Sequence, residues 1–303
     1  LKVIPASVKV VDIAGLTKGS ASGKGLGNRF LGALKECDAL LHVVRCFENP
    51  RVHRDGPLDP EGDMETVELE LALADLDTVE RNVDRVAKKA RLGDRELQAE
   101  LAAFERAQAL LEEGKGLRTE SWTSEERTFL RPLFLLTLKD VLVLANVGED
   151  DLEGKGEVAV ALALAAKNRG MGYLVFCGEL EHGLRSMEAD ERDLFQEEFG
   201  LKEPGLDRLI RSNYDLLKLQ TFFTAGEKEI RAWTVARGST APLAAGEIHS
   251  DFVKGFIRAE IYSVDDLAEH GSEAAIKSAG RMRTEGKDYI LQEGDVCHFL
   301  VGR

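Results

Sequence analysis

Two short apolar runs separated by one helix-forming segment constrain the fold of this chain more than any other feature. VLVLAN (141–146) and YLVFC (173–177) are typical of buried strands, and EVAVALALAAKNRG (157–170) between them consists of helix formers and ends in glycine. A strand, a helix and a second strand at this spacing predict parallel strands joined by a right-handed crossover. VKVVDI (8–13) and ALLHVVR (39–45) are two further candidate strands. The sequence therefore predicts an α/β protein built around a parallel sheet.

The middle of the chain has a different periodicity. Between Leu69 and Ala90, apolar residues alternate at three- and four-residue steps, which is the pattern of a coiled-coil seam. The tripeptide Leu-Gly-Asp at 92–94 interrupts this pattern, and a second helical segment follows. Its apolar side is formed by Leu97, Leu101, Phe104 and Leu111. Two helices separated by so tight a turn predict an antiparallel hairpin inserted into the α/β domain.

The C-terminal part predicts a small mixed sheet around a short helix. LQTFFTAG, KEIRAWTV and FIRAEIYS (256–263) are typical of strands, APLAAGEIHSDF (241–252) predicts the helix, and GKDYILQEGDVCHFLV predicts two strands around Glu-Gly-Asp. Such a set forms a compact domain of its own. We therefore expect an α/β domain made of residues 1–65 and 137–217, a helical insertion over 66–136, and a C-terminal domain over 218–303.

Composition excludes several classes of protein. The chain has 303 residues and a formal net charge of −14, so it is a poor candidate for nonspecific nucleic-acid binding, and we expect no DNA partner. No apolar run approaches the ~18 residues that a membrane-spanning helix needs, and we expect no membrane partner. The four cysteines lie far apart without a CxxC pair, which indicates reduced thiols and a cytoplasmic protein.

A glycine-rich segment near the start resembles a phosphate-binding loop but lacks its spacing. Gly19-Ser-Ala-Ser-Gly23-Lys24-Gly25 has three residues between the glycines instead of four, and Gly25 stands where a Walker A loop needs Ser or Thr. Asp12 and Gly15 instead match DxxG, the second phosphate element of P-loop NTPases. In that motif the aspartate binds Mg²⁺ through water and the glycine N–H reaches the γ-phosphate. Asp12 and Gly15 are thus the candidate catalytic residues, and Asp12 the candidate metal ligand, although the Asp and Gly of an isolated DxxG are usually structural.

A candidate base-binding motif follows the strand at 141–146. Asn146-Val147-Gly148-Glu149 occupies the place where GTPases carry NKxD, with Val in place of Lys and Glu in place of Asp. The longer carboxylate should not fit the two guanine N–H groups, whereas Asn146 can still bind a purine edge, so the motif favours adenine. Taken alone, these residues are more typical of a helix-capping Asn and a surface Glu.

A third element, Cys177-Gly178, ends the next strand, where backbone N–H groups commonly meet the base. Three elements in order at strand ends are more specific than any one of them.

These motifs together resemble the YchF or Obg-like ATPase family across essentially the whole chain. The segments that carry the resemblance are VDIAGLTKGSASGKGLGNRFL, HVVRCFEN, ELALADLDTVER, ANVGED, LQTFFTAGEKEIRAWTV, GEIHSDFVKGFIRAE and EGKDYILQEGDV. The resemblance implies a P-loop NTPase G-domain, a coiled-coil insertion and a C-terminal TGS domain of β-grasp type. It also implies a cytoplasmic, ribosome-associated protein that hydrolyses ATP in preference to GTP with Mg²⁺.

The resemblance also assigns residues to the nucleotide. Asn146, Val147 and Glu149 match the NVxE motif of the family, and Val147 inherits a contact with adenine, which we expect through its backbone. Phe47, at the end of HVVRCF, is expected to pack near the base, although an apolar residue at a strand end is normally part of the core. Leu16 lies where many GTPases place a water-orienting Gln, so we expect slow intrinsic hydrolysis.

The sequence departs from the family in one respect. The Walker A loop, with its Lys and its Mg²⁺-binding Ser, and the switch I Thr have no counterpart among these residues. We therefore expect nucleotide binding and hydrolysis from the intact protein, and only weak binding from residues 1–303 alone.

The predicted hairpin tip, residues 81–95, has six Arg or Lys against two Asp. A solvated helix face is the favoured interpretation, and the alternative is a contact with the ribosome, on the large or both subunits. The candidate rRNA-binding residues are Arg81, Arg85, Lys88 and Lys89, with the TGS domain as a second contact. Two other functions stay open: a ribosome- or RNA-binding adaptor in which nucleotide is only regulatory, and a GTPase with a degenerate base motif.

Overall fold

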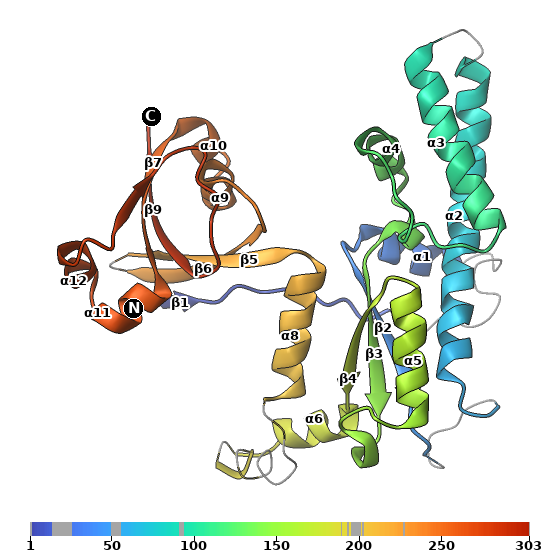
Figure 1. Cartoon of the computed structure of the whole chain (residues 1–303), viewed down its shortest axis with the longest axis horizontal. Coiled ribbons are helices and arrows are strands. Elements are labelled where there is room, and N and C mark those ends of the chain that lie inside the picture. Colours follow the sequence, from blue (N-terminus) through green and yellow to red (C-terminus); the bar gives the residue numbers. More distant parts are fainter. Residues whose placement is uncertain are drawn as a thin grey trace. The chain divides into compact units, whose positions relative to one another are not determined.

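The computed structural model describes residues 2–13, 26–49, 56–90, 94–188, 190–192, 194, 201, 203–226 and 228–302, with the backbone alone described for 26–30 (Figure 1). The chain divides into two compact units, Val11–Ser212 and a second unit formed by Leu1–Val10 with Asn213–Arg303. Each unit is described by itself. Within the described residues, no helix combines the length and the apolar character needed to cross a membrane.

A three-stranded parallel sheet forms the centre of the Val11–Ser212 unit. Its strand order is β2 (Leu40–Cys46), β3 (Val141–Val147) and β4 (Gly172–Phe176). Helix α5 (Glu157–Asn168) connects β3 to β4, so the predicted parallel crossover is confirmed.

The strand expected over residues 8–13 is wrong. These residues form no strand, and Val10 and Val11 are 66% and 47% exposed. A strand forms only where a neighbouring edge pairs its backbone N–H and C=O groups. For this N-terminal segment, that edge is β6 (Glu229–Ala236), which pairs in parallel with β1 (Lys2–Ile4). Residues 1–10, expected in the α/β domain, therefore group with the C-terminal unit.

Helices α2 (Pro60–Ala90) and α5 cover one face of the three-stranded sheet. The core between these helices and the sheet includes Val44, Met64, Leu71, Val143, Leu162 and Ala166. Helix α1 (Leu26–Glu36) adds Leu31 and Leu34 to the same core. The remaining elements of the unit are α4 (Ser124–Leu130), η2 (Arg131–Leu133), η3 (Leu136–Leu138), η4 (Glu149–Asp151) and α6 (Gly178–Arg185). Helix α8 (Gly205–Leu216) begins in this unit and ends in the C-terminal unit.

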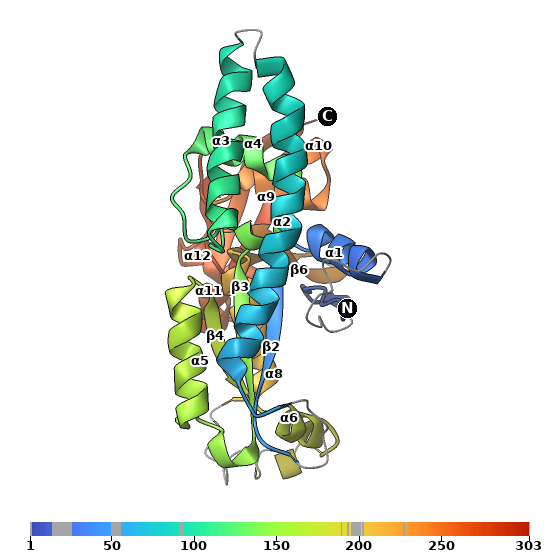
Figure 2. The ribbon, with the colours of Figure 1, turned by 90° about the vertical axis from the view of Figure 1, so that its right-hand side faces the viewer.

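The predicted pair of long helices is present. Figures 1 and 2 show α3 (Arg95–Glu112) beside the second half of α2, and Asp94 caps α3 by accepting hydrogen bonds from two backbone N–H groups. The apolar residues that the two helices share are Ala72, Leu76, Val79, Val83, Val86, Leu97, Leu101, Phe104 and Leu111. Leu69, expected in this seam, is 53% exposed. The first half of α2 packs on the sheet instead, and there Leu71 is the buried residue.

A buried carboxylate ties α2 to the segment before β3. Asp75 is fully buried, and its Oδ1 accepts a hydrogen bond from Leu136 N at 2.8 Å. Its Oδ2 accepts hydrogen bonds from the backbone N–H of Thr137 at 2.8 Å and from the Thr137 hydroxyl at 2.7 Å. These bonds fix η3 against α2 and so set where β3 begins.

The C-terminal unit holds a six-stranded mixed sheet with the order β1-β6-β5-β9-β7-β8. Its other strands are β5 (Leu219–Ala225), β7 (Phe256–Ser263), β8 (Arg283–Glu285) and β9 (Asp295–Val301). Its helices are α9 (Ala241–Ile248), α10 (Asp251–Gly255), α11 (Val264–His270) and α12 (Glu273–Ser278). Two expectations are wrong: the helix over 241–252 is two helices, and YILQ is not a strand.

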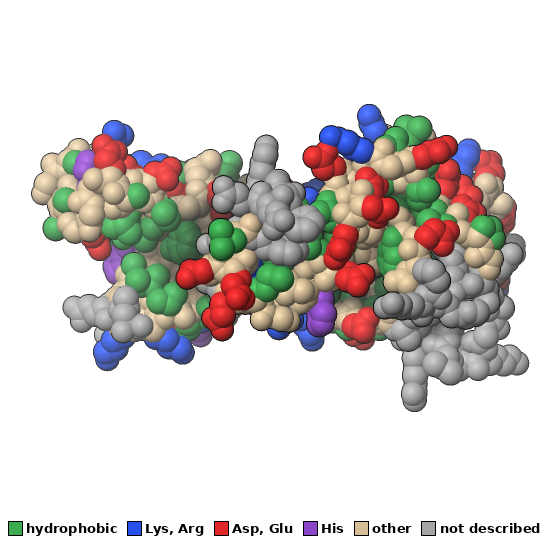
Figure 3. Space-filling view, turned by 90° about the horizontal axis from the view of Figure 1, so that it is seen from below, with side chains coloured by type: hydrophobic (Ala, Val, Ile, Leu, Met, Phe, Trp, Pro, Cys, Tyr) green, Lys and Arg blue, Asp and Glu red, His purple; other side chains and the backbone are tan. Residues whose placement is uncertain are grey.

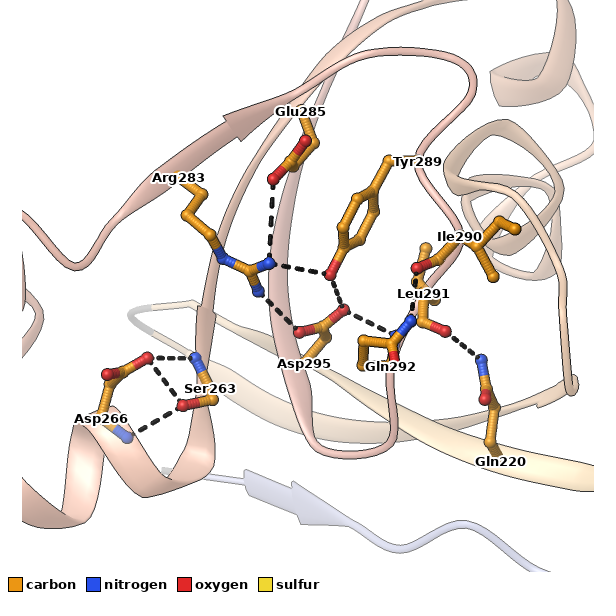
Figure 4. A network of polar contacts seen from close by, with 10 residues as sticks. All are labelled: Gln220, Ser263, Asp266, Arg283, Glu285, Tyr289, Ile290, Leu291, Gln292 and Asp295. Atoms are coloured by element: carbon orange, nitrogen blue, oxygen red, sulfur yellow. Dashed lines mark hydrogen bonds and ion pairs between the residues drawn. The ribbon is translucent and has the colours of Figure 1, made fainter.

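A polar network explains why the YILQ segment is a loop (Figure 4). Asp295 is 2% exposed and accepts hydrogen bonds from Arg283 Nη2 at 3.1 Å, from the Tyr289 hydroxyl at 2.8 Å and from Gln292 N at 2.9 Å. Gln220 Nε2 donates to the carbonyl of Leu291 at 2.9 Å. The segment pairs with its backbone neighbour only through an isolated antiparallel bridge between Thr240 and Ile290, and side chains bind the Leu291 carbonyl and Gln292 N, so a longer strand does not form.

Candidate nucleotide-binding site

The carboxyl ends of the three parallel strands bring a row of side chains to one face of the sheet. Asn146 on β3 is in register with Arg45 on β2 and with Phe176 on β4. Residues in register point to the same side of a sheet, and their neighbours along each strand point to the other. Arg45, Asn146 and Phe176 therefore lie on the face opposite α2 and α5. Open α/β sheets bind their ligands at this edge.

Asn146 is oriented by the loop that follows β4. Its Oδ1 accepts a hydrogen bond from Gly178 N at 3.0 Å, at the first residue of α6. A Cβ added at Gly178 would lie 3.3 Å from Asn146 Oδ1, so glycine gives this contact the room it needs. Among the described residues, none accepts a hydrogen bond from Asn146 Nδ2. The carboxamide thus presents a donor, and its acceptor is already engaged.

Val147 and Cys177 point away from this row. They are 2% and 6% exposed and share a core with Leu180 and Leu184. Burial raises the pKa of the Cys177 thiol, which keeps it protonated. Both residues can meet a ligand only through their backbone.

Phe47 follows β2 directly and is half-buried. Its Cβ would lie 3.6 Å from a Cβ added at Gly148, so the two strand ends approach each other where a glycine makes room. The guanidinium carbon of Arg45 lies 4.7 Å from the centroid of the Phe47 ring. Phe47 is therefore brought to the edge that carries Asn146.

Glu149 begins η4, and its side chain is exposed. Two residues on, Asp151 Oδ1 accepts hydrogen bonds from Lys155 N at 2.8 Å and from Gly156 N at 3.0 Å, which closes the loop after β3. Glu149 is thus held at the edge by its backbone while its carboxylate remains in solvent.

The phosphate-side residues are not assembled in the same way. Asp12 is exposed and does not end a strand, and Gly15 lies outside the described residues. In the part of the chain that the structure describes, Asp12 makes no hydrogen bond with Asn146, and no group of three His, Cys, Asp or Glu side chains could hold a metal ion. A single exposed carboxylate still fits Mg²⁺, which keeps several waters and takes one or two carboxylates alongside phosphate oxygens.

Three residues of this edge were not identified by sequence reasoning: Arg45, Phe176 and Glu181. Glu181 on α6 accepts hydrogen bonds from the first backbone N–H groups of α8, with Gly205 N at 2.6 Å. Strand register would have identified Arg45 and Phe176 as neighbours of Asn146, but no sequence pattern identifies Glu181.

At the hairpin tip, acidic residues partly offset the basic ones. Arg81 pairs with Asp77 at 2.8 Å, and Arg85 lies 4.0 Å from Glu100. Lys88 and Lys89 are exposed. On the face drawn in Figure 3, Asp and Glu side chains are scattered over the described surface, without a continuous field of Lys and Arg among them.

The parallel sheet, the helices that cover one of its faces and the polar row at its carboxyl edge define an α/β protein of the class that binds nucleotides at this edge. A protein-family model named YchF-GTPase_C, "Protein of unknown function (DUF933)", matches residues 219–302. The chain belongs to the YchF/Obg-like ATPase family.

Two curated relatives and one structure illustrate the family match. The chain is 48% identical over 300 residues to the ribosome-binding ATPase YchF of Escherichia coli O157:H7, covering 99% of this chain and 82% of that protein. It is 40% identical over 301 residues to Obg-like ATPase 1 of Caenorhabditis elegans, covering 98% and 76%. The structure of the Schizosaccharomyces pombe YchF GTPase matches with a TM-score of 0.86 at 33% identity, over 99% of this chain and 82% of that one.

Proposed function

We propose that this protein is a cytoplasmic, ribosome-associated ATPase switch that hydrolyses ATP to ADP in preference to GTP. The observation that carries the proposal is the edge itself, where Gly178 N orients Asn146 beside Phe47 and the backbone of Val147. The names of the relatives, ribosome-binding ATPase and Obg-like ATPase, support the same class of activity.

Purine recognition follows from the orientation of Asn146. With Oδ1 engaged by Gly178 N, the Nδ2 group donates to the purine N7, an acceptor that adenine and guanine share. The loop after β3 must then distinguish adenine from guanine. Glu149 lies where GTPases use the shorter Asp, and its carboxylate attracts the exocyclic amine of adenine and repels the carbonyl of guanine.

The phosphate side depends on Asp12 and on Gly15. Mg²⁺, when bound, neutralises charge on the phosphates, and Asp12 holds it through water. The backbone N–H of Gly15 would donate a hydrogen bond to the γ-phosphate. Leu16 has no group to orient water, so we expect slow hydrolysis until a partner accelerates it.

The C-terminal domain and the helical insertion are the parts that we expect to contact the ribosome. We propose that residues 218–303 form a TGS domain and residues 66–136 a coiled-coil insertion, and that nucleotide state changes how they engage the ribosome. Of the residues expected in the α/β domain, 1–65 and 137–217, residues 1–10 and 213–217 group with the C-terminal unit. The exposed Lys88 and Lys89 are the strongest candidates for an rRNA contact because the other two candidates, Arg81 and Arg85, have acidic neighbours.

Calorimetric titration with ATP and with GTP tests the proposal, in a protein that carries the family's Walker A segment ahead of residue 1. Asn146→Ala should weaken ATP binding about tenfold or more, because it removes one hydrogen bond to the base and leaves Gly178 N–H unpaired. Asn168→Ala, at the exposed end of α5, is the matched control and should bind like the wild type. Tighter binding of GTP than of ATP would favour the GTPase alternative, and no binding of either would favour the adaptor.

A further inference from the structure

Three contacts of Arg45 at the end of β2 lead to the segment that carries Phe47. Its Nε donates to the Phe47 carbonyl at 2.9 Å, and its Nη2 donates to the Asn49 carbonyl at 3.4 Å. Its guanidinium lies over the Phe47 ring, 4.7 Å from the centroid. One side chain thus holds both the backbone and the ring of the residue next to the base edge.

We propose that Arg45 is a positioning residue that fixes Phe47 as a side wall of the purine site. The inference rests on the proposed nucleotide-binding function. Arg45 acts through Phe47, because its Nε and Nη2 donate to carbonyls of the segment that carries Phe47.

The position of Phe47 explains why it needs Arg45 to hold it. Phe47 is the first residue after β2, so no strand neighbour fixes its backbone. Its Cβ lies beside Gly148, which offers no side chain to pack against. Arg45 supplies both constraints, since it bonds the carbonyl and covers one face of the ring. We expect the other face to stack on a planar base, and stacking of a base on an aromatic ring is worth about 1–3 kcal/mol.

The chemistry also explains why the residue is arginine. Its planar group can stack on a ring while its N–H groups donate in the plane to two carbonyls. A lysine at this position keeps the charge but has one ammonium, which cannot stack and bridge two acceptors at once. Arg45→Lys should therefore behave more like Arg45→Ala than like the wild type.

The test measures ATP affinity by calorimetry in the protein that carries the Walker A segment. The variants are Arg45→Ala, Arg45→Lys, Phe47→Ala and the double variant Arg45→Ala/Phe47→Ala, with Arg127→Ala on the exposed face of α4 as control. We expect Phe47→Ala and Arg45→Ala each to weaken ATP binding about tenfold, and the double variant to bind no more weakly than Phe47→Ala. A residue with a merely structural role would give additive losses and a lowered melting temperature.

The outcomes separate the two hypotheses. ATP binding by the wild type together with unchanged binding by Arg45→Ala, or additive losses in the double variant, overturns the role of Arg45 alone. A wild type that binds neither nucleotide overturns the proposed function and this role with it. If Arg45→Ala does not fold, the ATP affinity of Arg45→Lys tests the role instead, because this variant keeps the positive charge and removes the planar guanidinium.

Discussion

Asp75 allows the sharpest test of how the two halves of the α/β unit are joined. Replacing it with alanine leaves three donors without an acceptor: the N–H groups of Leu136 and Thr137 and the Thr137 hydroxyl. Both residues are fully buried, so water cannot replace the carboxylate. Each unsatisfied buried amide costs about 1–3 kcal/mol, and the hydroxyl can rotate to another acceptor. Removing the buried carboxylate also removes its desolvation cost, which offsets part of this penalty. We therefore expect Asp75→Ala to lower the free energy of unfolding by about 3 kcal/mol.

The assay is urea unfolding followed by tryptophan fluorescence. The chain has two tryptophans. Trp122 packs in the helical hairpin core, and Trp233 lies in the C-terminal unit. A Trp233→Phe background therefore reports on the α/β unit alone. Asp77→Ala on the same helix is the control, because Asp77 is exposed and its ion pair with Arg81 contributes about 0.5 kcal/mol or less. A loss for Asp75→Ala within about 0.5 kcal/mol of the control would refute the reasoning.

The same residue predicts a pH dependence. Burial raises the pKa of Asp75 above its ordinary value of 3.8, against the hydrogen bonds from Thr137 and Leu136, which lower it. Between the unfolded and the folded pKa the folded state binds more protons, so the contribution of Asp75 to stability is full below the unfolded pKa and is lost as pH rises through the folded one. Asp75→Asn does not titrate at this position. The difference between its free energy of unfolding and that of the wild type should therefore become smaller as pH rises through that window. A deficit that widens would contradict the sign.

Three further predictions concern the site, the hairpin tip and the C-terminal unit. Gly178→Ala should weaken ATP binding roughly fivefold with little change in melting temperature, since its Cβ would crowd Asn146 Oδ1 at 3.3 Å; unchanged affinity in a calorimetric titration would count against the orienting role of Gly178. Lys88→Glu with Lys89→Glu should reduce co-sedimentation with ribosomes, and equal sedimentation would favour a solvated face. Asp295→Ala should destabilise the C-terminal unit by about 2–4 kcal/mol, measured by Trp233 fluorescence, because it leaves Gln292 N and the Tyr289 hydroxyl without their acceptor; a loss below about 0.5 kcal/mol would mean that the loop does not need the carboxylate.

Local pattern was sufficient wherever an element's own periodicity decides its structure. β2, β3 and β4 were predicted because short apolar runs rich in Val and Leu are typical of strands in a parallel sheet. The long helices α2 and α3 were predicted because their apolar residues repeat at helical spacing and Leu-Gly-Asp separates them. Family membership followed in the same way, from motifs that each occupy a short stretch of chain.

The local sequence pattern could not predict which distant segment each strand or helix packs against. VKVVDI has the composition of a strand, but the edge that takes up the N-terminal segment is β6, more than two hundred residues away, and it selects Lys2–Ile4. YILQ also has the composition of a strand, but Asp295 and Gln220 bind its backbone as a loop. Leu69 fits the seam by spacing, but the sheet below α2 buries Leu71 instead.

The sequence by itself determined which residue types stand at each strand end: Asn146 and Glu149 after β3, Gly178 after β4, and Phe47 after β2. Tertiary structure decided how those groups are presented, because sheet register puts Arg45 and Phe176 on the same face as Asn146, and a backbone N–H from the next strand end engages one of its two polar atoms. Composition and spacing specify chemistry along the chain. Orientation depends on hydrogen bonds between segments distant in sequence, and those exist only once the chain has folded.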